Sequence, residues 1–83
     1  MTNEIMVSHL RQIFHEESRL RRYKIAVDVE SEGNSKTITL GGRVNLFHQK
    51  QVAQSLVQRY IAAHKMNGLA GSVVTIENNL KAE

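Results

Sequence analysis

The chain contains four histidines, the residues most able to hold a metal ion in a protein without cysteine. On the first helix that we expect, His9 and His15 lie about 240° apart around the axis, so they do not share a face. On the second expected helix, His48 and His64 point in well-separated directions. None of them has a histidine four residues away or a carboxylate at ligand spacing. We therefore interpret all four as surface or boundary residues and predict no metal site.

Glu16 and Glu17 form an adjacent pair of acids, the residue type that most often carries general acid–base chemistry together with histidine. Neighbouring residues of a helix point about 100° apart, and both acids lie in a polar stretch near the expected helix end. Catalytic acids need a desolvated cleft to shift their pKa values. No serine–histidine–acid arrangement has local support either. We predict solvated surface acids and a protein that is not an enzyme.

The segment Thr37–Leu40 leads into Gly41-Gly42 and then into a helix, which is also the local plan of phosphate-binding loops. A Walker loop needs GxxxxGK followed by Ser or Thr, and a dinucleotide fingerprint needs GxGxxG. Neither spacing is present. We interpret the junction as a packing feature, in which Gly42 lies on the inward face of the strand and lets the second helix approach the sheet. No cofactor is predicted.

Composition narrows the class of protein further. A chain of 83 residues has room for one domain with one modest core. It has no cysteine for a disulfide framework or a thiolate zinc site. No apolar stretch reaches the length of a membrane span, and no signal peptide is visible. We expect a cytoplasmic protein by default, or a periplasmic or membrane-peripheral one if the chain is cut from a longer exported protein. The net charge of +3 gives a weak bias toward anionic partners.

The apolar residues recur at helical spacing in two segments and alternate in three others. The order helix–strand–strand–helix–strand predicts a single α+β domain over 1–83, a two-layer sandwich with both helices on one face of a three-stranded sheet. The expected elements are a helix from Thr2 or Asn3 to about Glu17, strands over 25–30 and 37–44, a helix over 45–66 ending at Asn67-Gly68, and a strand marked by Val74, Ile76 and Leu80.

These patterns also predict which side chains are buried. The apolar arc of the first helix contains Ile5, Met6, Val7, Leu10, Ile13 and Phe14, and that of the second contains Leu46, Val52, Ala53, Leu56, Val57, Tyr60 and Ala63. A common core of Ile38, Leu40, Ala53, Leu56, Tyr60 and Ile76 is expected.

The order and spacing of several short segments resemble the BON domain, named for bacterial osmotic-stress and nodulation proteins. The segments are Ile38-Thr39-Leu40-Gly41-Gly42-Arg43-Val44, then Ala53 in the following helix, then Ile76-Glu77-Asn78-Asn79-Leu80. The resemblance runs from about Glu4 to Ala82. The chain departs from it in the longer segment NGLAGSVV before the last strand and in having a single copy. The resemblance implies a non-enzymatic module that contacts phospholipid membranes or envelope-associated proteins.

Two groups of residues are candidates for such contacts. Arg43, Phe47 and Lys50, together with His48, would form an apolar tip ringed by cations if the Phe47 ring is exposed, which suits an anionic phospholipid surface. The alternative is that Phe47 covers the first helix or the sheet edge. Arg21 and Arg22 belong to the densest cationic run, RLRRYK, which would either grip phosphates or form a solvated connection.

The expected function is therefore binding to an anionic phospholipid surface or to a protein. The alternatives are a cytosolic protein-interaction or structural domain that does not bind lipid, and a weak nucleic-acid binder acting through residues 19–24. No specific nucleic-acid binding is expected, because the open face of the sheet carries acids and no aromatic side chain for base stacking. That face is predicted to display Ala26, Asp28, Glu30, Thr37, Thr39, Arg43, Thr75, Glu77 and Asn79.

Overall fold

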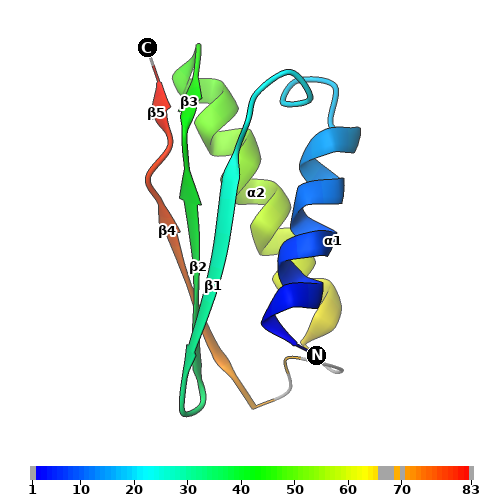
Figure 1. Ribbon diagram of the computed structural model, residues 1–83, viewed down its shortest axis with the longest axis vertical. Helices are drawn as coiled ribbons and strands as arrows, with labels where there is room; N and C mark the ends of the chain where they lie inside the picture. The colour runs from blue at the N-terminus through cyan, green and yellow to red at the C-terminus, as the bar shows by residue number, and fades with distance from the viewer. Residues whose placement is uncertain (1, 66–68, 70, 83) are drawn as a thin grey trace.

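The computed structural model describes residues 2–65, 69 and 71–82 and has two layers, with both helices on one face of a sheet (Figure 1). The predicted α+β class and the arrangement of the two layers are confirmed. The predicted helix stop at Asn67-Gly68 lies outside the described residues. The elements are α1 (Asn3–Glu16), β1 (Ala26–Glu32), β2 (Ser35–Gly41), β3 (Arg43–Val44), α2 (Phe47–His64), β4 (Val73–Asn78) and β5 (Lys81–Ala82).

The main sheet has the strand order β1-β2-β4. A tight turn at Gly33-Asn34 joins β1 to β2 as an antiparallel hairpin, and α2 carries the chain across to β4, which runs parallel to β2. The predicted strand over 37–44 is wrong in one respect, because the chain breaks at Gly42 into β2 and β3. The last strand breaks in the same way, and β3 pairs with β5 as a short parallel ladder. The β3–β5 ladder begins beside the break, where the amide of Lys81 donates to the carbonyl of Gly42 at 3.0 Å.

The core lies between the sheet and the helices, as the two periodicities predict. Alternate residues of β1 and β2 face inward, and every fourth residue of α1 meets them. The buried side chains include Met6, Leu10, Phe14, Val27, Val29, Ile38, Leu40, Val52, Ala53, Val57 and Tyr60. Leu56 and Ile76 are half-buried against this cluster, so the expected common core is confirmed.

Two members of the predicted apolar arc of α2 are not in the core. Leu46 is 61% exposed, because the helix begins at Phe47, two residues later than predicted, and Leu46 occupies the cap position with an extended backbone. Ala63 is exposed near the end of the helix. On α1, Ile5 is likewise 46% exposed. The core is completed by Leu20, Leu69 and Leu80, of which the helix and strand patterns predict the last one alone.

Gly42 does not play the packing role that its position in the sequence suggests. It is exposed, and a Cβ atom there would lie 2.7 Å from the carbonyl oxygen of Lys24, a backbone atom in the segment before β1. Its φ of +118° is also a conformation that L-residues with a side chain rarely adopt. The glycine is needed so that two backbone segments can approach each other, and its role is not the approach of α2 to the sheet.

Candidate functional site

Three segments that are separate in sequence meet at one end of the long axis of the molecule. They are the connection between α1 and β1, the strand β3, and the beginning of α2 (Figure 1). Gly42 contacts Lys24 through the backbone, and the side-chain amide of Gln49 on α2 reaches the carbonyl of Arg19 at 3.5 Å. The two groups of candidate residues predicted from the sequence therefore lie at the same end. We call this surface the basic end and define it by Arg19, Arg21, Arg22, Lys24, Arg43, His48, Lys50 and Lys81.

Two large apolar side chains project at the basic end. Phe47, the first residue of α2, is 62% exposed, so of the two alternatives for this ring the exposed one is observed. Leu46 beside it is 61% exposed and is a site residue that the sequence pattern did not reveal. Asn45, directly before it, and Gly41-Gly42 a few residues earlier indicate that the helix starts near this point. Leu46 was nevertheless assigned to the core, because it falls within the apolar arc of the helix. Arg43 is exposed on β3, and Lys50 is half-buried one turn into α2.

The start of α2 departs from the usual chemistry of a helix N-terminus. Helices favour Ser, Thr, Asp or Asn as the cap and acids in the first turn, because the first amides are unpaired and the macrodipole is positive there. Here the cap residue is Leu46, which has no side-chain acceptor, and the first turn contains no acid but does contain His48 and Lys50. Within the described residues, the backbone amides of Phe47 and His48 have no hydrogen-bond acceptor. This end of the helix is therefore suited to an anion.

Gln49 holds this helix start in place, as the N3 residue of half a capping box. Its side-chain oxygen accepts hydrogen bonds from the amides of Asn45 and Leu46, at 2.9 and 3.0 Å. These bonds fix the turn that precedes the helix, and they leave the side chains of Leu46 and Phe47 directed away from the core.

The two arginines of the second candidate group have different surroundings. Arg21 donates from Nε to the carbonyl of His15 at 2.9 Å and from Nη2 to that of Glu16 at 3.4 Å, so its guanidinium caps the C-terminus of α1. Arg22 lies 5.2 Å from the centre of the Tyr23 ring and donates to its hydroxyl at 3.1 Å. Arg21 therefore has a structural position, whereas Arg22 is held on an aromatic surface.

At the basic end, hydrogen bonds and charges of neighbouring side chains shift the pKa values of three residues. Nε of Arg19 donates to Glu17 at 2.8 Å, and this hydrogen bond lowers the pKa of the Glu17 carboxyl and raises that of Arg19. For Tyr23, burial raises the pKa, but the hydrogen bond and charge of Arg22 contribute to a larger opposing effect, so the pKa lies below its usual value. Acids elsewhere are concentrated toward the hairpin and on the open face of the sheet. They include Glu4, Asp28, Glu30, Glu32 and Glu77, all of them exposed.

A second polar cluster joins the two helices. Nδ1 of His9 on α1 lies 2.8 Å from the hydroxyl of Tyr60 on α2, and the ring of His64 lies against that of Tyr60 with centroids 4.3 Å apart. Sequence reasoning missed this contact because His9 and Tyr60 are far apart in the chain. In the described part of the chain, no group of three or more His, Cys, Asp or Glu side chains could hold a metal ion.

Comparison of the chain with protein-family models, curated proteins and solved structures finds no match in any of the three. The resemblance to the BON domain therefore stays a proposal. Over the described residues, neither helix is long and apolar enough to cross a membrane.

Proposed function

We propose that this chain is a non-enzymatic binding domain of BON type whose basic end docks on an anionic phospholipid surface. The observation that supports the proposal best is the placement of Leu46 and Phe47, two apolar side chains more than half exposed, at a helix N-terminus surrounded by cations. Residues of this kind enter the boundary between head groups and acyl chains, while basic side chains contact the lipid phosphates.

The start of α2, whose cap residue Leu46 has no side-chain acceptor, supports the same partner. Placing the charge of Lys50 near the positive end of a helix dipole is locally unfavourable, and an external anion bound there offsets that repulsion. A lipid phosphate would also accept hydrogen bonds from the amides of Phe47 and His48. Local rules of helix design that are broken in this way are commonly broken at functional sites.

Simple magnitudes agree with reversible binding. Full burial of a Leu or Phe side chain contributes about 1.5–3 kcal/mol, and each cation near an anionic surface about 1 kcal/mol. Arg43, Phe47 and Lys50 remain the leading contacts, with Leu46 added to them. Arg22 is a peripheral contact, and Arg21 contributes mainly by fixing the end of α1.

Co-sedimentation with vesicles tests this function. We expect binding to vesicles that contain an anionic phospholipid, weakening as salt rises because exposed charges are screened beyond about 8–10 Å. Phe47→Ala should reduce binding even at low salt, since it removes apolar contact and no charge. Lys50→Ala should weaken binding more than Lys65→Ala, a matched loss of one lysine beyond the other end of α2.

The result that would contradict the proposal is equal binding to zwitterionic and anionic vesicles, or binding to neither. In that case the second candidate, a protein partner that recognises the same apolar and cationic end, would replace the lipid surface.

A further inference from the structure

The outer edge of β1 carries backbone groups that pair with no other strand. The carbonyl of Leu40 accepts from the amide of Asn79, so the backbone groups of Leu40 face β4. Because these groups alternate sides along a strand, those of Thr39 face β1, where the register places Asp28 opposite.

The same alternation along β1 gives the direction in which the amide and carbonyl of each of its residues point. Those of Asp28 and Glu30 face β2, and those of Val27 and Val29 face away from the sheet. Within the described residues, no hydrogen bond to the amides or carbonyls of Val27 and Val29 is present, and β1 pairs with β2 alone. Each of these two residues, although only 6% and 7% exposed as a whole, therefore has one backbone donor and one acceptor that no other strand pairs with.

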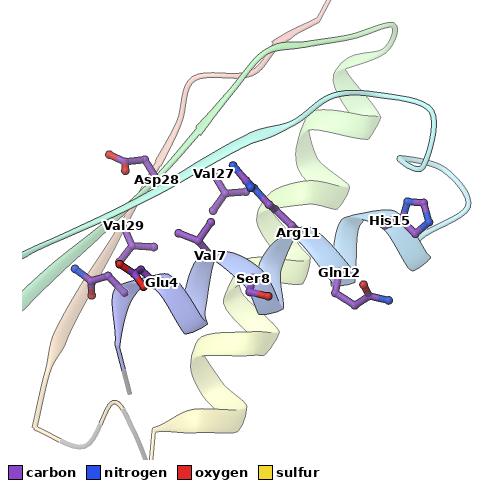
Figure 2. Close-up of a pocket in the computed structure, with 10 residues that line it drawn as sticks. Glu4, Val7, Ser8, Arg11, Gln12, His15, Val27, Asp28 and Val29 are labelled. Atoms are coloured by element: carbon purple, nitrogen blue, oxygen red, sulfur yellow. The ribbon is translucent and has the colours of Figure 1, made fainter.

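This edge borders a groove of about 820 Å³ between β1 and α1. Figure 2 shows Val7 pointing from α1 toward Val27 and Val29, with Arg11 reaching toward the strand and Glu4 lying near Val29. The side chain of Asn3 closes one end, because its Oδ1 accepts from the hydroxyl of Ser31 at 3.1 Å. The groove thus has an apolar floor, charged walls and an unpaired strand edge along one side.

We propose that this groove binds an extended peptide segment of a partner protein, which adds to β1 as a fourth strand of the sheet and carries basic residues at alternate positions. Addition of a strand to a sheet edge beside a helix is an established mode of peptide recognition, in which backbone hydrogen bonds hold the peptide and side-chain contacts select its sequence. The surface is separate from the basic end, so the inference does not depend on lipid binding.

The charges along β1 determine which segment fits. Asp28 and Glu30 project from the open face, where side chains of an added strand would lie beside them, and opposite charges across strands are stabilising. The intervening peptide residues would face Val7 and favour apolar side chains. A second copy of β1 would instead bring Asp28 and Glu30 beside the same acids, which disfavours self-association at this edge.

A labelled peptide of alternating valine and lysine is the probe. We expect it to bind the full chain at physiological salt in a fluorescence anisotropy titration. Two further peptides, N-methylated at every valine or at every lysine, each lose the donors along one edge. One of them should bind at least tenfold more weakly than the other, because a single edge of the peptide pairs with β1. Equal affinities for the two methylated peptides, or no binding of the parent peptide, would overturn the proposal.

Variants of the protein locate the peptide on the sheet. Asp28→Lys should weaken binding about fivefold through repulsion across the strands. Glu77→Lys is the matched control, because it makes the same charge change on the same face but on β4, at the far edge, and we expect less than a twofold effect there. Equal effects of the two substitutions would show attraction to the general acidity of the face and would overturn the assignment to β1.

Amide hydrogen exchange provides a direct check of the edge. In the free protein, the amides of Val27 and Val29 should exchange faster than those of Asp28 and Glu30, which pair with β2. Saturating peptide should slow Val27 and Val29 severalfold and leave Asp28 and Glu30 unchanged. Exchange at Val27 and Val29 that does not respond to the peptide would overturn the proposal.

Discussion

A Cβ atom on Gly42 would lie 2.7 Å from the carbonyl oxygen of Lys24, closer than real side chains approach a backbone atom. This contact joins the connection after α1 to the break between β2 and β3. It brings the run of cations in residues 19–24 next to the start of α2, so the basic end depends on a glycine at this position.

Gly42→Ala should lower the free energy of unfolding by about 2–3 kcal/mol, since it combines a backbone clash with a φ of +118°. Gly41→Ala is the matched control, because its added Cβ would meet the Cβ of Ala26 at an ordinary 3.9 Å and its φ is not positive. We expect that control to change the free energy by no more than about 0.5 kcal/mol. Chemical denaturation measures both, and similar values for the two variants would contradict the role assigned to Gly42.

Leu20, within the cationic run RLRRYK, is fully buried in the core. Leu20→Ala should therefore cost about 2–4 kcal/mol of unfolding free energy. Arg21→Ala should give a smaller loss, because it removes hydrogen bonds to the carbonyls at the end of α1, and Arg22→Ala should leave stability nearly unchanged. Equal stability of the Arg21 and Arg22 variants in denaturant would contradict the capping role of Arg21.

The two tyrosines of the chain should titrate separately. Burial raises the pKa of Tyr60 above 10.0, whereas Tyr23 lies below that value. In a spectrophotometric titration, Tyr60→Phe should retain the ionisation of Tyr23, at the lower pH. Tyr23→Phe should retain the ionisation of Tyr60, at the higher pH. As the pH rises above about 10, the unfolded chain loses the Tyr60 proton before the folded one does, so stability should fall there. Tyr60→Phe should lessen that alkaline loss, and identical pH profiles for Tyr60→Phe and the unsubstituted protein would contradict it.

Nucleic acid should bind weakly and without sequence preference. The described open face displays Asp28, Glu30 and Glu77 and no aromatic side chain, so bases find no stacking platform and phosphates are repelled. A fluorescence titration with single-stranded RNA at physiological salt checks this expectation. Micromolar binding that is lost when Arg22 is changed to Ala would show that the basic end recognises a different polyanion.

The elements were predictable because their signals are local. Apolar residues alternate in β1 and recur every four residues in α1, so residues close in sequence indicate which face is buried. Both predicted faces are confirmed. The partner of Gly42 was not predictable, because Lys24 approaches it from a distant part of the chain. The burial of Leu20 was missed because this residue belongs to no periodic apolar pattern. Leu46 was misassigned to the core because it begins the apolar pattern of α2, whereas the helix itself begins one residue later, at Phe47.

At the candidate site, the sequence predicted the residue types but not their arrangement. It predicted Phe47 with Arg43 and Lys50 as an apolar tip among cations, and it predicted Arg21 and Arg22 as a separate contact. The structure places both groups at one end, where backbone contacts between distant segments hold them. In the structure, Arg21 also donates hydrogen bonds to carbonyls at the end of α1, a capping role that a charge pattern in the sequence does not reveal.

The most direct test of membrane docking is the position of the Phe47 side chain relative to the acyl chains. The chain has no tryptophan, so Phe47→Trp introduces a single reporter, and Val73→Trp is the matched control at an apolar position 64% exposed on β4. With anionic vesicles containing brominated acyl chains, we predict blue-shifted and strongly quenched emission for Phe47→Trp and unchanged emission for Val73→Trp. Equal quenching of the two reporters, or quenching of neither, would contradict docking through the start of α2.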